Sequence, residues 1–259
     1  MKDKVIVITG ASAGIGAALA KICAARGAKL VLTARREPEL AAIANAIGAK
    51  HVVADAASRA DTERVRDVAL ATYGGLDVWV ANAGRGISRA VGELTDADVD
   101  DMMLTNFKSV LYGIQAVLPR FKETKRGHMI AISSMLGRIP IAPIRSAYSA
   151  SKAAVNSIMT SLRLELRPDF PEIHVTTVMP GVVATDFGKN SLHGGPDSRN
   201  LPMAQPVGEA ATVIADVIET PRAEVYTRPE LQQLAARYFS AEDVGTVEAQ
   251  PPFGMMPRR

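Results

Sequence analysis

Residues 5–16 have the sequence VIVITGASAGIG, and their pattern indicates the fold expected for the whole chain. Val5–Thr9 is a short apolar run that favours a buried strand, and Ile15–Arg26 has apolar residues at helical spacing. Glycine in the turn between them lets the backbone bend tightly and lets an anion approach the free N–H groups at a helix N-terminus. The stretch therefore predicts a nucleotide pyrophosphate site, although a plain strand-to-helix turn is the simpler alternative. The predicted site comprises Gly10, Ser12, Ala13, Gly14, Ile15 and Gly16.

Short apolar runs and longer stretches of helical period alternate along most of the chain. Strands that are apolar on both faces need a sheet covered on both sides, which predicts an α/β fold with a doubly wound parallel sheet. Ligands of such sheets bind at the carboxyl ends of the strands. Further strands are predicted at Leu30–Thr33, His51–Ala54, Val78–Ala81, Met129–Ile132, His174–Met179 and Glu224–Thr227. Helices are predicted at Glu37–Ala46, Ala60–Tyr73, Ala147–Leu166, Val207–Glu219 and Glu230–Phe239, with a long one from Thr95 towards Leu118 that ends before Pro119.

Two regions depart from this alternation, and the rest is expected to form a single domain over residues 1–246. Residues 187–206 are polar, rich in Gly, Asn and Ser, and have no clear period, which predicts a mobile lid over a site. Residues 247–259 contain three prolines and end in two arginines. We expect this tail to be extended or disordered, or to lie across a neighbouring subunit.

The composition excludes several classes of protein. The formal net charge is only +3 and is spread along the chain, which does not suit a nucleic-acid-binding protein. The one cysteine, Cys23, excludes an intramolecular disulfide, and the four histidines have no metal-ligand spacing, so no metal site is expected. No apolar run is long enough for a signal peptide or a membrane span. We therefore expect a cytoplasmic protein.

Two arginines mark the end of the second strand, where the adenosine ribose of a bound dinucleotide would lie. A carboxylate there would bind the ribose hydroxyls, but the sequence has Ala34, Arg35 and Arg36 instead. Guanidinium groups pair with phosphate, so NADP(H) is favoured over NAD, with Arg35 the better candidate. The alternative is that the arginines only solvate the start of the next helix.

A second group of functional candidates follows the fifth strand. Tyr148 and Lys152 are four residues apart, on one face of a helix, and an ammonium beside a phenol lowers its pKa. Alone, Tyr148 could be core and Lys152 solvated. Ser134, however, ends the fifth strand at the edge where ligands bind, and Asn106 is an unfavourable residue inside a helix.

These motifs together resemble the short-chain dehydrogenase/reductase family from Lys2 to about Thr227. TGASAGIG at 9–16, NAG at 82–84, Asn106, Ser134, YSASK at 148–152, and PG at 180–181 followed by Thr185 stand in the family's order. The resemblance implies a Rossmann-type NAD(P)-dependent oxidoreductase that acts on an alcohol or carbonyl group, usually as a homodimer or homotetramer.

The resemblance also implies roles for individual residues. Tyr148 is the general acid-base, Lys152 binds the nicotinamide ribose and depresses the Tyr pKa, Ser134 orients the substrate oxygen, and Asn106 shapes its helix around a proton-relaying water. Asp55 resembles the family's adenine-contacting acid, with a helix N-cap as the alternative. The implied cofactor-binding set is Gly10, Ser12, Ala13, Gly14, Ile15, Gly16, Arg35, Arg36, Asp55, Ala56, Asn82, Ala83, Gly84, Tyr148, Lys152, Pro180, Gly181, Val183 and Thr185.

The expected substrate side is mostly apolar, which suits a hydrophobic or cyclic ketone or aldehyde and a carbonyl reductase activity. Arg138 and Arg145 leave room for a substrate carboxylate, unless both point to solvent. Two other functions are possible on this scaffold: an NADP-binding sensor without turnover, which would not need the four catalytic residues, and an isomerase or dehydratase, which would need further acid-base groups. His193 is a weak candidate for such a group.

Overall fold

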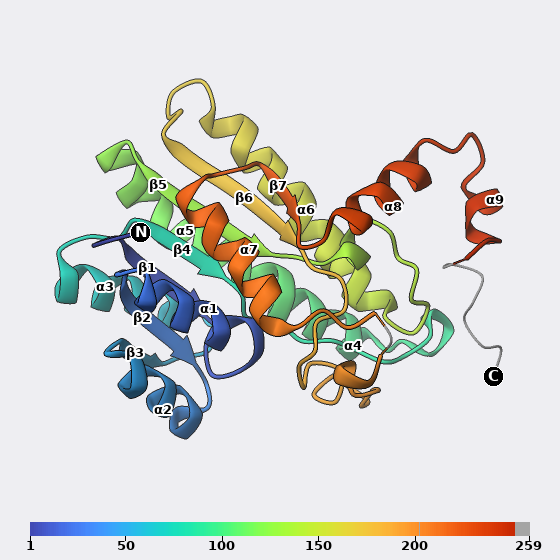
Figure 1. Cartoon of the computed structure of the whole chain (residues 1–259), viewed down its shortest axis with the longest axis horizontal. Coiled ribbons are helices and arrows are strands. Elements are labelled where there is room, and N and C mark those ends of the chain that lie inside the picture. Colours follow the sequence, from blue (N-terminus) through green and yellow to red (C-terminus); the bar gives the residue numbers. More distant parts are fainter. Residues whose placement is uncertain (202, 252–259) are drawn as a thin grey trace.

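Seven parallel strands form the centre of the molecule across residues 1–201 and 203–251, the part of the chain that the computed structural model describes (Figure 1). Their order is β3-β2-β1-β4-β5-β6-β7, so the chain winds outward from β1 in both directions, as expected for a doubly wound sheet. The strands are β1 (Val5–Thr9), β2 (Lys29–Ala34), β3 (Lys50–Val53), β4 (Val78–Ala81), β5 (Gly127–Ile132), β6 (Ile173–Met179) and β7 (Glu224–Tyr226). The predicted fold is confirmed.

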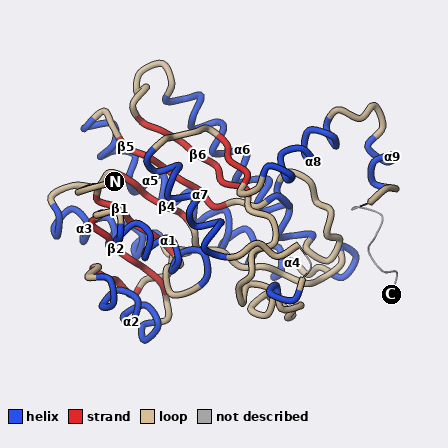
Figure 2. The backbone as a smooth tube through the Cα atoms, in the orientation of Figure 1, coloured by secondary structure: helices blue, strands red, loops and turns tan. Residues whose placement is uncertain are grey.

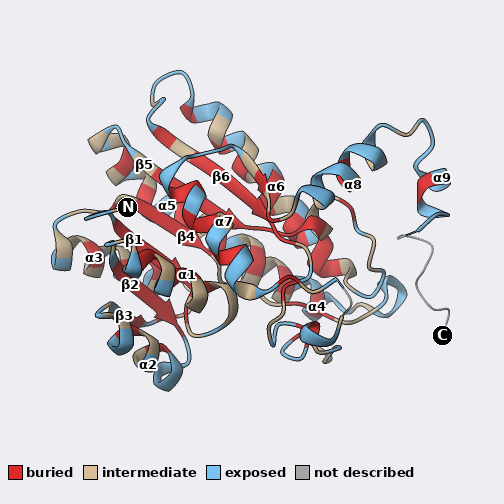
Figure 3. Ribbon diagram, viewed as in Figure 1, coloured by how far each residue is buried: buried red, intermediate tan, exposed pale blue. Residues whose placement is uncertain are grey.

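Helices cover both faces of the sheet because successive strand residues point to opposite sides. Ile6 and Ile8 pack with α1 and α7, which lie side by side (Figure 2), whereas Val5 and Val7 pack with α3, α5 and α6. Figure 3 shows that the sheet between these layers is almost entirely buried. The helices are α1 (Gly14–Ala25), α2 (Glu37–Ile47), α3 (Arg59–Tyr73), α4 (Asp96–Met102), α5 (Ser109–Thr124), α6 (Ser146–Leu166), α7 (Val207–Glu219), α8 (Pro229–Phe239) and α9 (Val244–Glu248).

The long helix differs from its prediction in two ways. It does not end before Pro119, which lies inside α5. A proline inside a helix costs roughly 3 kcal/mol, but burying a side chain such as Phe121 contributes about 1.5–3 kcal/mol. Phe121 packs directly over Gly127, where a Cβ would lie 2.3 Å from its ring, so the core holds the helix together past the proline. The second difference is a π-helical turn, η2 (Met103–Lys108), between α4 and α5.

The C-terminal part is more regular than expected. The predicted helix over 230–239 is present as α8, and α9 follows it at one end of the molecule (Figure 1). Asp243 caps α9 by accepting a hydrogen bond from the Gly245 N–H at 2.9 Å. Val247, expected to begin an extended tail, is therefore helical and buried, whereas residues 252–259 of that tail lie outside the described part. Within the described residues, no helix combines the length and hydropathy needed to cross a membrane.

Candidate active site

The glycine turn is held in place by the end of the neighbouring strand β4. Asn82 Nδ2 donates hydrogen bonds to the carbonyl oxygens of Thr9 at 2.9 Å and Gly10 at 3.2 Å. Gly10 has a positive φ of 65°, and a Cβ there would stand 2.9 Å from the Ala83 Cα. A Cβ on Gly16 would stand 2.6 Å from the Gly10 carbonyl oxygen. Both positions therefore require glycine, and β1 and β4 meet through backbone contacts.

The N-terminus of α1 is suited to an anion. Its N-cap residue, Ala13, supplies no side-chain acceptor, and the first turn contains no acidic residue. The first N–H groups and the positive end of the helix dipole can therefore bind a phosphate. Thr185 reaches the same turn, because its Cγ2 lies 3.4 Å from the position of a Cβ on Gly14. The glycine turn and the 180–185 segment are thus brought together as expected, and they fit a dinucleotide pyrophosphate.

The two arginines at the end of β2 differ in where they reach. Arg36 extends over the glycine turn and donates a hydrogen bond from Nη2 to Ser12 Oγ at 3.1 Å, while its Nη1 lies 3.3 Å from Glu39 Oε1. Arg35 is 67% exposed, and its Nη1 lies 3.8 Å from Asp55 Oδ2. The sequence favoured Arg35, whereas contact with the glycine turn belongs to Arg36.

Asp55 is not a helix N-cap. Ser58 caps α3 by accepting a hydrogen bond from the Asp61 N–H, and Asp55 Oδ1 instead accepts one from the Ala57 N–H at 2.9 Å. Asp55 therefore stabilises the turn that carries Ala56 at the end of β3. The alternative of an N-cap is wrong, and the predicted contact with adenine remains a prediction.

Tyr148 and Ser134 lie together at the carboxyl edge of the sheet. Ser134 follows β5, and Tyr148 lies in the first turn of α6 with 7% of its surface exposed. Burial raises the pKa of the Tyr148 phenol, while a hydrogen bond with the Ser134 hydroxyl and the charge of Arg145 oppose that rise. The Phe187 ring packs edge-on against the Tyr148 ring, with 5.5 Å between the centroids.

Lys152 lies one helical turn further along α6. Its Nζ donates a hydrogen bond to the Ile132 carbonyl oxygen at 2.8 Å and lies 5.9 Å from the centroid of the Tyr148 ring. Burial lowers the pKa of Lys152 to about 8, so the amine is still mostly protonated at pH 7. The sequence led us to expect a lowered pKa for Tyr148. The structure gives the opposite direction, because the cost of desolvating the buried phenolate outweighs the charges around it.

Asn106 connects the π-helical turn η2 to the active site. Its Nδ2 donates to Ser151 Oγ at 3.0 Å and to the Arg85 carbonyl oxygen at 2.9 Å, and its Oδ1 accepts from the Arg85 N–H at 2.8 Å. Gly84 lies beside it, since a Cβ there would stand 3.1 Å from Asn106 Oδ1 and 3.4 Å from Lys152 Nζ. The four predicted catalytic residues therefore converge with the NAG segment, and π turns are frequent at functional sites.

Sequence analysis missed a buried pair that supports these residues. Ser133 Oγ donates to Asn156 Oδ1 at 2.5 Å, and Asn156 Nδ2 donates to the Gly137 carbonyl oxygen at 3.0 Å. The pair joins β5, α6 and the loop between them. The signal available was the same as for Asn106, an asparagine inside a helix, which indicates that its amide has a local partner.

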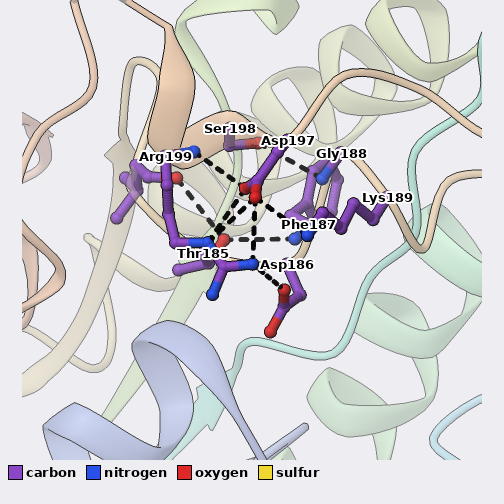
Figure 4. A network of polar contacts seen from close by, with 9 residues as sticks. Thr185, Asp186, Phe187, Gly188, Lys189, Asp197, Ser198 and Arg199 are labelled. Carbon is purple, nitrogen blue, oxygen red and sulfur yellow. Dashed lines mark hydrogen bonds and ion pairs between the residues drawn. The ribbon is translucent and has the colours of Figure 1, made fainter.

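The segment predicted as a lid lies over this site and is cross-linked by its own polar side chains. Asp197 lies 2.9 Å from Lys189 Nζ and 3.0 Å from Arg199 Nε, and Arg199 Nη2 lies 2.6 Å from Asp186. Figure 4 shows this network. His193 Nε2 lies 2.7 Å from Asp98 Oδ1 on α4, so its observed partner is a carboxylate rather than the phenol. Whether the segment opens and closes remains a prediction. Among the described residues, no cluster of His, Cys, Asp and Glu could hold a metal ion.

Comparison with known proteins gives consistent results. The family model for short chain dehydrogenases matches residues 4–194. An uncharacterized oxidoreductase of Listeria monocytogenes is 39% identical over 192 residues, 72% of this chain and 77% of its own, and one of Staphylococcus aureus is 35% identical over 188 residues, 71% and 80% of the two chains.

Solved structures agree with the sequence matches. A short-chain dehydrogenase from Streptomyces avermitilis has a TM-score of 0.82 at 29% identity and covers 96% of this chain and 97% of its own. An alcohol dehydrogenase from the archaeon Thermococcus sibiricus, complexed with 5-hydroxy-NADP, has a TM-score of 0.75 at 28% identity, covering 86% and 95%. A Burkholderia phymatum short chain dehydrogenase/reductase in complex with NAD has the same fold, with a TM-score of 0.85 at 24% identity over 100% and 98%. Matched along most of its length in both sequence and fold, the chain belongs to the short-chain dehydrogenase/reductase family and is an oxidoreductase.

Proposed function

We propose that this protein is an NADP(H)-dependent oxidoreductase that interconverts a carbonyl compound and the corresponding alcohol, a secondary alcohol where the substrate is a ketone. The observation that supports this most strongly is the convergence of Tyr148, Ser134 and Lys152 at one edge of the sheet, where Lys152 and Asn106 both lie beside Gly84 of the NAG segment. When bound, the nicotinamide cofactor supplies or accepts the hydride.

The chain's own residues hold the substrate oxygen and move the proton. The Tyr148 hydroxyl donates a proton to the carbonyl oxygen during reduction and takes it back during oxidation. The Ser134 hydroxyl, which lies close enough to the phenol to lower its pKa, orients the same oxygen. Lys152 remains mostly protonated near neutral pH, so it stabilises the phenolate that forms when Tyr148 gives up its proton.

The proposed preference for NADP(H) rests on Arg35 and Arg36, now with a greater weight on Arg36. No carboxylate ends β2, and the guanidinium of Arg36 already lies against Ser12 in the glycine turn. A charge-assisted hydrogen bond to a phosphate contributes roughly 1.5–3 kcal/mol, and about 1.4 kcal/mol is a tenfold change in affinity. One arginine in contact with the 2′-phosphate is therefore enough to select NADPH.

The proposed substrate is largely apolar. Val182, Phe187 and Ile144 expose apolar surface close in sequence to the site residues. Such walls suit a hydrophobic or cyclic ketone or aldehyde better than a sugar. A cytoplasmic location and a homodimeric or homotetrameric assembly belong to the same proposal.

Titration of the purified protein with NADPH and NADH, followed by NADPH oxidation with a panel of aldehydes and ketones, tests this function. We expect NADPH to bind at least about tenfold more tightly than NADH. Arg36→Ala should remove most of that difference, whereas Arg120→Ala should not. Arg120 is a suitable control because it forms an (i, i+3) ion pair with Glu123, as Arg36 does with Glu39.

The same experiment separates the other functions. Tight NADPH binding without turnover of any carbonyl compound would favour a sensor, and conversion of a substrate without net NADPH consumption would favour an isomerase or dehydratase. Equal affinities for the two reduced cofactors would refute the proposed preference.

A further inference from the structure

Arg145 is a partly buried arginine at the active site that has no acidic partner. Its Nη1 donates hydrogen bonds to the Ile87 carbonyl oxygen at 3.0 Å and to Ser191 Oγ at 2.6 Å, both of which are uncharged. Among the described residues, no carboxylate lies within 4 Å of its guanidinium, and its Nε and Nη2 have no hydrogen-bond acceptor. Neither nitrogen is completely buried.

The guanidinium lies on the Tyr148 side of the active site. Both Arg145 and Phe187 lie close to Gly86: a Cβ on Gly86 would stand 2.9 Å from Arg145 Nη1 and 3.0 Å from Phe187 Cε1. Phe187 in turn packs against the Tyr148 ring. Arg145 and Tyr148 are close enough for the charge of each to affect the pKa of the other. Arg145 is thus not a solvent-facing loop arginine.

The surroundings fix the guanidinium in one position. A Cβ on Gly86 would stand 2.9 Å from Nη1, and a Cβ on Gly195 would stand 3.0 Å from Nη2. The backbone of both loops therefore approaches the guanidinium at positions that have no side chain. A cation held in this way has already lost much of its conformational entropy, so a ligand that binds it does not have to order it.

The other arginine of the same loop differs. Arg138 forms an ion pair with Glu224 at the start of β7, so its charge is already compensated within the chain. Arg145 has no such partner, so burial disfavours its charged form and lowers its pKa. Its planar guanidinium has two nitrogens, Nε and Nη2, that can donate side by side to the two oxygens of a carboxylate.

From this arrangement we infer that Arg145 binds a carboxylate of the substrate, so that the preferred substrate is an apolar carbonyl compound that also bears a carboxylate, an oxo acid or the corresponding hydroxy acid. The carbonyl oxygen lies at Tyr148 and Ser134, and the carboxylate lies at the free Nε and Nη2 donors of Arg145. This inference rests on the proposed function, because it assigns the substrate class of the same site.

The test compares aliphatic oxo acids of increasing carbonyl-to-carboxylate separation with their methyl esters, using NADPH as the reductant. One carbonyl-to-carboxylate separation should match the distance from Tyr148 to Arg145. For the acid with that separation, we expect the wild-type kcat/KM to exceed that of its ester about tenfold or more. Arg145→Gln should abolish that difference by raising the KM for the acid far more than the KM for the ester. Arg145→Lys should restore part of the acid–ester difference, because lysine keeps the positive charge but cannot form two parallel hydrogen bonds to a carboxylate.

Arg167→Gln is the matched control, because it removes one exposed positive charge at the other end of α6. It should behave as wild type with both substrates. Should Arg145→Gln fold poorly, the wild-type enzyme still provides a test: an unreactive aliphatic carboxylate should inhibit ester reduction competitively, and its primary amide should not.

Three results would overturn the inference while leaving the proposed function intact: no preference for any acid over its ester, an equal loss on acid and ester in Arg145→Gln, or equal inhibition by carboxylate and amide. If Arg145→Gln shifts the pH profile equally for both substrates and keeps the acid–ester difference, Arg145 acts only through Tyr148 and the inference is wrong. Failure to reduce any carbonyl compound would refute the proposed function itself.

Discussion

Burial shifts the pKa of several side chains in this molecule. Desolvation is the largest influence on Tyr148, Lys152 and His128, and in each it favours the neutral form: the pKa of the phenol rises, and those of the amine and the imidazole fall. A phenol that keeps its proton at neutral pH can donate it to a carbonyl oxygen. These directions could not be predicted from sequence, because they depend on how completely the fold excludes water.

His128 gives a prediction about stability. Its Nε2 lies 2.8 Å from Thr176 Oγ1, and because that hydroxyl donates to the Arg222 carbonyl oxygen, Nε2 is the nitrogen that carries the hydrogen. Nδ1 is buried without a partner, and desolvation, together with the charges of His174 and Lys4, lowers the pKa of His128 from 6.5 to about 3. The unfolded state therefore binds the proton more readily throughout that interval.

Because the unfolded state takes up this proton first, we expect His128 to lower the free energy of unfolding by about 1.4 kcal/mol per pH unit as the pH drops from 6.5 towards 3. The stabilisation that comes from keeping His128 neutral in the folded state is fully present above pH 6.5. His128→Gln, which keeps a donor for Thr176 and cannot titrate, should lose less stability over the same interval. Urea denaturation at several pH values measures this, and parallel pH profiles for the two proteins would contradict it.

At the scale of elements, the motif-bearing turns were predictable and the breaks in regularity were not. The glycine turn, NAG and YSASK follow strands or begin helices, so their sequence alone places them at one edge of the sheet. The continuation of α5 past Pro119 depends on Phe121 packing over Gly127, and the π turn η2 depends on the bonds of Asn106 to Arg85, which no local pattern reveals.

The glycine turn gives a prediction at this scale. In Gly16→Ala, the new Cβ would stand 2.6 Å from the Gly10 carbonyl oxygen, which is backbone and has to shift. The shift displaces the N–H groups that we assign to the pyrophosphate, so we expect the Kd for NADPH to rise at least about tenfold. Isothermal titration measures it.

Gly208→Ala is the control, because a Cβ there meets nothing within 4 Å and Gly208 lies in helix α7. It should leave NADPH affinity unchanged and, if anything, stabilise the protein by up to about 1 kcal/mol. An equal affinity for NADPH in Gly16→Ala and wild type would show that the turn does not bind the cofactor.

For the whole molecule, the sheet order brings together residues that are far apart in the sequence. β1, β4 and β5 are adjacent, so the glycine turn, the NAG segment and Ser134 share one edge, and α6 places Tyr148 and Lys152 over it. Sequence patterns predicted this because the strands are apolar on both faces. They could not predict which arginines meet acids within the chain, as Arg138 meets Glu224, and which, like Arg145, do not.

The central claim is that Tyr148 transfers the proton in an NADP(H)-dependent reaction, and Tyr148→Phe tests it most directly. The variant loses only a hydroxyl, so NADPH binding, measured by fluorescence titration, should stay within a few fold of wild type. The rate of NADPH oxidation with the best carbonyl substrate should fall by about 10²–10⁴-fold or more, the contribution of general acid catalysis. A kcat near that of wild type, with the cofactor bound normally, would contradict the account.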